Sequence, residues 1–248
     1  MYALYDGDYP RATTDIDLLA RGIGNDIDEM KTVFTHIFSI TTDDPLKFDW
    51  ESLDVKSITE FKEYHGVNVS ITAFMDRTRI PVSIDIGFGD VIYPDRILMD
   101  FPVLLSEDAP EVYAYSLYSS IAEKFEAMVL LGYDNSGFKD FYDIYVNAQK
   151  YDFDGQILVE AIKETFDQRG TSLHTIVAFN PEYSDDAIRL SRWKSFVKKK
   201  KDSLDVTLPE TIEVIKQFLL PVTNAIETGR SFDAKWDSRE QQWNDNCQ

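Results

Sequence analysis

The sequence is poor in the residues that form covalent cross-links or zinc sites. Its 248 residues include one cysteine, Cys247, and three histidines, at positions 36, 65 and 174. One cysteine cannot form an internal disulfide, and these histidines lack the spacing of metal ligands. We therefore exclude a disulfide scaffold and a zinc site. A reducing, cytoplasmic setting is the simplest interpretation.

Long apolar runs and an excess of positive charge are also missing. No segment approaches the roughly 20 apolar residues that cross a bilayer, and the first residues lack the basic and apolar segments of a signal peptide. The chain has 25 Lys and Arg against 44 Asp and Glu, a formal net charge of −19. This charge opposes non-specific binding to nucleic acid or to an anionic membrane. We expect no membrane partner, and any RNA contact must be local.

The residues that are present describe a folded protein of two parts. Apolar residues make up 44% of the chain and aromatic residues 13%, too many for a disordered protein. Residues 1–150 mix strand and helix patterns, whereas residues 151–248 show helical patterns alone. We therefore predict an α+β protein: a mixed sheet with flanking helices in 1–150, followed by a helical bundle in 151–248.

Periodicity and cap residues place the individual elements. Strands are predicted at Asp15–Ala20, Val67–Met75 and Ile80–Ile86, because apolar residues alternate or run together there. The predicted helices are 25–38 with Asn25 as N-cap, 116–131, 137–149, 155–169, 184–201 and 209–227. Pro209 suits a first helical turn, and Gly229 suits a helix end.

The strongest chemical signal is the pair Asp15 and Asp17. In a strand, two residues separated by one other point to the same face, so Ile16 and Leu18 point to the opposite face. Two such carboxylates can hold Mg²⁺, which also takes ligands from substrate phosphates. The alternative is a pair of solvated acids on a strand edge.

Asp85 supplies a third acid. Val82, Ile84 and Ile86 alternate onto one strand face, which leaves Ser83 and Asp85 on the other. If this strand lies beside that of Asp15 and Asp17, three carboxylates converge, as phosphoryl chemistry with metal ions requires. The alternative is a strand-end Asp bonded to a turn at Gly87 or Gly89.

A third group combines lysines and acids on two predicted helices. Phe138, Phe141, Tyr142 and Tyr145 follow helical spacing and predict a core stripe, which places Lys139 and Asp143 as an i, i+4 pair on its flank. A surface ion pair is the plain explanation. The functional alternative is that Lys124 or Lys139 meets a nucleotide phosphate while Asp140 or Asp143 orients that lysine or the base.

Basic residues concentrate at one place. Seven lie within 13 residues, interleaved with Trp193 and Phe196: Arg189, Arg192, Lys194, Lys198, Lys199, Lys200 and Lys201. This cluster is the best candidate for contact with an RNA backbone. A solvated helix end is an equally good interpretation, because lysines favour helix C-termini.

Four segments in this order resemble one family: P-R-A-T-T-D-I-D-L-L, S-I-D-I-G, A-E-K-F-E-A-M and G-F-K-D-F-Y-D-I-Y. They are similar to the AbiEii/AbiGii toxins of the nucleotidyltransferase superfamily, the enzymatic halves of type IV toxin–antitoxin pairs. The similarity continues through Phe166–Thr171, Arg192–Phe196, Phe218–Val222 and Trp236.

The resemblance implies a function and a site. The function is Mg²⁺- or Mn²⁺-dependent transfer of a nucleotide from an NTP to RNA, with tRNA as the expected acceptor, in a cytoplasmic toxin–antitoxin or phage-defence system with a cognate antitoxin. Asp15, Asp17 and Asp85 would be catalytic metal ligands, and Lys124, Asp140 and Asp143 further catalytic residues. Thr13, Lys124 and Lys139 would bind the nucleotide.

One departure supports a rival interpretation. The superfamily places a Gly-Gly or Gly-Ser turn a dozen or more residues before the D-x-D pair, whereas here only Gly7 precedes Asp15. Either the start is truncated, or the chain is an inactive nucleotidyltransferase-fold protein that binds a nucleotide or an antitoxin. A metal-dependent glycosyltransferase would explain the D-x-D pair but not the Lys124 group, so we rank it last.

Overall fold

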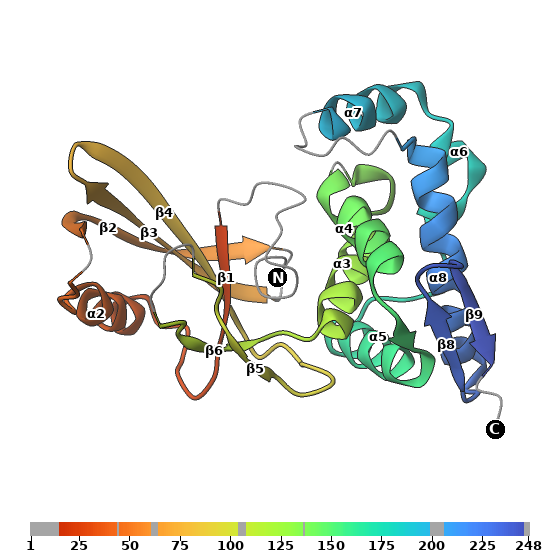
Figure 1. Cartoon of the computed structure of the whole chain (residues 1–248), viewed down its shortest axis with the longest axis horizontal. Coiled ribbons are helices and arrows are strands. Elements are labelled where there is room, and N and C mark those ends of the chain that lie inside the picture. Colours follow the sequence, from red (N-terminus) through yellow and green to blue (C-terminus); the bar gives the residue numbers. More distant parts are fainter. Residues whose placement is uncertain are drawn as a thin grey trace. The chain divides into compact units, whose positions relative to one another are not determined.

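The computed structural model describes residues 15–43, 45–60, 64–103, 108–135, 137–198 and 206–245. It shows two compact units, of which one is Ala12–Asp90 and the other contains Val91–Gln248 (Figure 1). The predicted division near residue 150 therefore differs from the boundary between compact units, and as a division into functional domains it stays a prediction.

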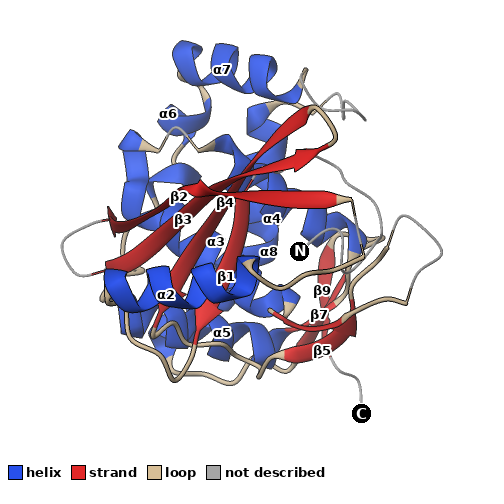
Figure 2. Cartoon of the chain, turned by 90° about the vertical axis from the view of Figure 1, so that its left-hand side faces the viewer, coloured by secondary structure: helices blue, strands red, loops and turns tan. Residues whose placement is uncertain are grey.

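The first unit is a four-stranded mixed sheet with one helix on one face (Figure 2). The strand order is β1 (Asp15–Ala20), β4 (Thr78–Phe88), β3 (Tyr64–Met75) and β2 (Leu46–Glu60). β1 runs parallel to β4, and the other neighbours are antiparallel. The mixed sheet and the predicted strands are confirmed; the long edge strand β2 was not predicted.

Helix α2 (Ile27–Phe38) covers one face of this sheet. Its buried Met30 and Phe34 pack in a cluster with alternate residues of the strands: Val55, Val67, Val69, Ile84 and Ile86. The helix is capped by Asp26, whose carboxylate accepts from the Glu29 amide at 2.9 Å, so the prediction of Asn25 as N-cap is wrong by one residue. Because the buried apolar side chains of the strands face α2, the polar side chains that alternate with them lie on the opposite face of the sheet.

The second unit is built mainly from helices. The larger ones are α3 (Leu117–Leu131), α4 (Phe138–Lys150), α5 (Gly155–Arg169), α7 (Ala187–Val197) and α8 (Leu208–Thr228). Shorter elements are the hairpin β5 (Ile97–Asp100) and β6 (Glu111–Ala114), helix α6 (Pro181–Ser184), and the 3₁₀ turns η1 (Gly132–Asp134) and η2 (Val177–Phe179). The predicted helix 184–201 is therefore divided and shorter, because Asp186 caps a new helix through the Arg189 amide at 2.8 Å.

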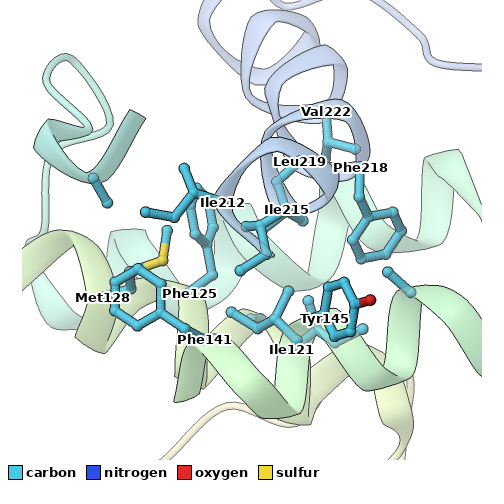
Figure 3. Close-up of a cluster of buried hydrophobic side chains, with 14 of the residues drawn as sticks. Ile121, Phe125, Met128, Phe141, Tyr145, Ile212, Ile215, Phe218, Leu219 and Val222 are labelled. Atoms are coloured by element: carbon cyan, nitrogen blue, oxygen red, sulfur yellow. The ribbon is translucent and has the colours of Figure 1, made fainter. Parts of the chain in front are cut away.

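Helix α8 packs along α4 and α5, and its apolar face also reaches side chains of α3 (Figure 3). Ile212, Ile215 and Phe218 of α8 are buried among Ile121 and Phe125 of α3 and the aromatic stripe of α4. The four stripe residues predicted for α4, Phe138, Phe141, Tyr142 and Tyr145, are all buried. A capping box between Thr207 and Glu210 begins α8, and Gly229 ends it with a φ of 62°.

The expectation of helices alone after residue 151 is wrong. A small sheet joins β7 (Phe153–Asp154), β8 (Ala234–Asp237) and β9 (Gln242–Asp245). These strands are too short to show an alternating pattern. The sheet extends the core, since Trp236 is buried and its indole Nε1 donates to the Ala148 carbonyl at 2.6 Å.

We expect Trp236→Phe to destabilise the second unit measurably. Ala148 lies in the last turn of α4, where carbonyls have no partner within the helix, so losing the indole leaves a buried acceptor unsatisfied. The expected loss is about 1–3 kcal/mol of unfolding free energy, measured by urea denaturation. Trp50→Phe on the half-exposed edge of β2 is the control, with a change within about 0.5 kcal/mol. Equal effects would contradict the role of Trp236.

Candidate active site

Asp17 and Asp85 lie opposite each other on adjacent strands. In the parallel pairing of β1 with β4, Asp15 is opposite Ser83 and Asp17 opposite Asp85. The strand of Asp85 therefore does lie beside that of Asp15 and Asp17, which was the condition for these acids to converge. The backbone register puts these four residues on one face, since Ile84 and Ile86 alternate into the core beneath α2. The side chain of Asp15 lies outside the described part.

Asp85 is held from its other side by Asn68 of β3. The Asn68 amide Nδ2 donates to Asp85 Oδ1 at 2.6 Å and to Ser83 Oγ at 3.0 Å. Asp85 is only partly buried, so it does not bear the full cost expected for an acid in a buried strand. Asn68 could not be identified from the sequence, because its contacts depend on which strand lies next to β4.

The chemistry of Asp17 and Asp85 fits a hard cation. Carboxylate oxygens are the ligands that Mg²⁺ takes in small number, while substrate phosphates and water complete its shell. Among the described side chains, no group of three or more His, Cys, Asp and Glu is arranged to hold a metal. Two carboxylates with a triphosphate still meet the requirement of Mg²⁺, and Asp15 would add a third by its register.

Lys124 and two acids form a buried group in the second unit. Lys124 Nζ of α3 lies 2.9 Å from Asp143 Oδ2 and 3.5 Å from Asp140 Oδ1, both on α4. The side chains of Lys124, Asp140 and Asp143 are 20%, 14% and 1% exposed. The suggested surface pair of Lys139 with Asp143 is therefore wrong: Asp143 faces the interior and pairs with α3, and Lys139 is exposed.

The pKa of Asp140 shows that burial disfavours the charged form of its carboxyl. Burial raises the pKa of its carboxyl above the ordinary value, against the opposing effect of the ammonium groups of Lys124 and Lys139. The side chain of Lys124 remains partly open to solvent. An ammonium held in this way can meet the negative charge of a phosphate.

A neighbouring ion pair serves the fold. The buried Glu126, two residues after Lys124 on α3, accepts from Arg169 Nη1 of α5 at 2.8 Å and from the Thr171 hydroxyl. These three residues tie the end of α5 to α3. Sequence reasoning included them in the family resemblance without a role, and the structure gives them one in packing.

The basic segment on α7 divides into packed and exposed residues. The Arg189 guanidinium donates to the Tyr133 carbonyl at 2.5 Å and lies 4.4 Å from the Tyr183 ring centroid. Trp193 is buried, and its indole donates to the Val206 carbonyl at 2.8 Å. Arg192, Lys194 and Lys198 are exposed. Of the four described cations in this segment, these three are therefore available for the RNA contact, which stays a prediction.

Some predicted residues lie outside the described part of the chain. They are Gly7, Thr13, Lys199, Lys200 and Lys201. The predicted roles of Thr13 in nucleotide binding and of these lysines in RNA binding stay predictions. None of the described helices has both the length and the apolar character needed to cross a bilayer.

We expect Asp140→Asn and Asp143→Asn to have opposite effects on stability. Folding raises the pKa of Asp140, so this carboxyl contributes stability below its unfolded pKa and loses it as the pH rises through the folded value. Asp140→Asn should therefore have a higher unfolding free energy than wild type at neutral pH. This difference in unfolding free energy should shrink as the pH falls toward 3.8.

Asp143→Asn should instead lose about 1.5–3 kcal/mol at neutral pH, because it removes the nearer carboxylate from a largely buried ammonium. Denaturant titrations between pH 4 and pH 8 measure both effects, with the exposed Asp134→Asn as control. A loss of stability in Asp140→Asn at neutral pH would contradict this account of its burial.

Comparison with solved structures gives distant similarity only. JHP933 from Helicobacter pylori is 12% identical, with 92% of this chain and 82% of that chain covered and a TM-score of 0.47. A second H. pylori protein, assigned as a nucleotidyltransferase, is 12% identical over 94% and 88% of the two chains, with a TM-score of 0.45. No curated protein matches significantly.

The comparison with protein families is decisive. The model of the nucleotidyl transferase AbiEii toxin, type IV toxin–antitoxin system, matches residues 1–237. The match covers both units, and with them the strand pair of Asp17 and Asp85 and the Lys124 group. The chain is thus a member of the AbiEii family of nucleotidyl transferase toxins from type IV toxin–antitoxin systems.

Proposed function

We propose that this protein transfers a nucleotide from an NTP to the 3′ end of tRNA in a Mg²⁺-dependent reaction. The family supports nucleotidyl transfer and an antitoxin partner. The observation that carries the proposed site is the in-register pair of Asp17 and Asp85, two carboxylates on adjacent strands. Since NTPs and tRNA are cytoplasmic, the proposal includes that location. Growth arrest by a modified tRNA would suit phage defence.

In the proposed reaction the acceptor hydroxyl attacks the α-phosphorus of the NTP. A new oxygen–phosphorus bond forms, the bond to the β-phosphate oxygen breaks, and pyrophosphate leaves. Asp85 accepts the proton of the attacking hydroxyl, directly or through one water. A Mg²⁺ bound by Asp15, Asp17 and Asp85 would supply charge neutralisation at the phosphates. Asp17 serves only as a ligand and a source of negative charge.

Lys124 has a separate task in this proposal. Its ammonium neutralises charge on the triphosphate, and Asp140 and Asp143 keep it oriented through contacts of 3.5 and 2.9 Å. Lys139, which is exposed, provides a second cation for the nucleotide. The acids on α4 therefore act through Lys124 and do not need to touch the reacting atoms.

Replacing either central carboxylate should abolish transfer while the protein stays folded. We expect Asp17→Asn and Asp85→Asn to lower transfer by about 10²–10⁴-fold, because each removes a metal ligand and Asp85→Asn also removes the base. The assay incubates protein with labelled NTPs, Mg²⁺ and total tRNA, and measures label on the RNA. Asp54→Asn is the control: Asp54 is an acid on the same sheet, two strands from Asp85, paired with Lys56.

The outcomes of this assay separate the alternatives. Transfer by wild type and by Asp54→Asn, but not by Asp17→Asn or Asp85→Asn, supports the site. Transfer that survives in Asp85→Asn contradicts the role of Asp85. Absence of transfer from wild type with every NTP, together with retained NTP binding, would favour a nucleotide-binding protein without activity.

The exposed cations of α7 give a further prediction. Changing Arg192, Lys194 and Lys198 to Gln should weaken tRNA binding and reduce the slope of log affinity against log salt by about 0.7–0.9 for each lost phosphate contact. The control changes Lys163, Lys235 and Arg239, exposed residues of the same unit, and removes equal charge. NTP affinity should not change. Equal salt slopes in the two triple variants would show an ordinary solvated surface.

A further inference from the structure

We propose that Asn68 is a positioning residue that orients Asp85 for metal binding, an inference that rests on the proposed function. Asn68 lies on β3, directly opposite Asp85 of β4 in the antiparallel register. It thus forms the third member of a row that begins with Asp17 on β1 and continues through Asp85. The row places one neutral amide beside two carboxylates.

The hydrogen bonds determine which end of the amide faces Asp85. An ionised carboxylate only accepts hydrogen bonds, so the atom 2.6 Å from Asp85 Oδ1 must be the amide nitrogen. The second hydrogen of this nitrogen is directed to Ser83 Oγ at 3.0 Å. Both hydrogens of the Asn68 amide are therefore used on residues of β4, and the side chain is fixed by two contacts.

This arrangement restrains the carboxylate. Asp85 cannot rotate about its Cβ–Cγ bond without breaking the contact at Oδ1, so Oδ2 keeps a constant direction. Partners that hold a metal-binding carboxylate in place commonly contribute 10–100-fold to metal affinity or activity. Asn68 supplies this restraint without adding charge to the site.

The stability of the sheet does not explain an asparagine here. Asn is disfavoured in strands, where Val, Ile and Thr pack better. The neighbours Val67 and Val69 supply the buried contacts of β3, while Asn68 points to the polar face. An Asp at this position would set two carboxylates at hydrogen-bond distance, and one of them would have to hold a proton. The neutral amide of Asn68 donates a hydrogen bond to Asp85 without placing a second negative charge beside it.

The test is binding of Mn²⁺ in the presence of a non-hydrolysable NTP analogue, followed by electron paramagnetic resonance. Asn68→Leu, which keeps the branched shape and the number of side-chain heavy atoms but has no donor, should weaken Mn²⁺ binding about 10–100-fold. If the leucine disturbs the sheet, the smaller variant Asn68→Ser tests the same point and should also weaken Mn²⁺ binding. Ser70→Ala is the matched control, since Ser70 lies on the same strand and the same face, opposite Ser83, and its binding should equal that of wild type.

Kinetics give a second measurement on the same variants. In Asn68→Leu the lost restraint should raise the apparent KM for Mn²⁺, and excess Mn²⁺ should restore much of kcat. In Asp85→Asn, excess Mn²⁺ should not restore kcat. Wild-type Mn²⁺ affinity in a folded Asn68→Leu, with weak binding in Asp85→Asn, would overturn the role of Asn68 and leave the proposed site intact. Unchanged Mn²⁺ binding in both Asp17→Asn and Asp85→Asn would overturn the proposed site itself.

Discussion

The parallel pairing of β1 with β4 is the constraint on which the meeting of Asp17 and Asp85 depends. Residues in a strand alternate between two faces, so one register decides which side chains meet. The observed register places Asp17 opposite Asp85 and Leu18 opposite Ile86. A shift of one residue would place Asp17 opposite an isoleucine of β4 whose side chain enters the core beneath α2. The burial of Ile84 and Ile86 therefore disfavours a register in which Asp17 would share their face.

The second unit contains charged side chains in its interior. Lys124, Asp140 and Asp143 are largely buried, and burial of charge is costly unless the charges are paired. Helices α3 and α4 pack directly against each other and share one apolar core with α8, which makes the close approach of Lys124 and Asp143 a consequence of core packing (Figure 3). The raised pKa of Asp140 indicates that burial of its own carboxylate reduces stability at neutral pH.

Much of the local structure could be predicted from the sequence. Strong periodicity and good caps located β1 and α5 with their full bounds, and they located α3 within one residue. Alternation also placed Asp15, Asp17 and Asp85 on common faces. Features that depend on tertiary contacts were missed: the bonds of Asn68, the inward direction of Asp143, and the small sheet of β7, β8 and β9. Spacing within one element cannot reveal a partner on another.

The same distinction explains why the basic segment was harder to interpret than the acids. The exposed cations and buried aromatics of α7 alternate as the faces of one amphipathic helix: Trp193 enters the core while Arg192 and Lys194 remain outside. Aromatic interleaving thus belongs to packing and carries no information about bases. A basic surface that attracts a backbone does not need to recognise sequence. Any selectivity for an acceptor would therefore have to arise elsewhere than from the aromatic rings of this segment.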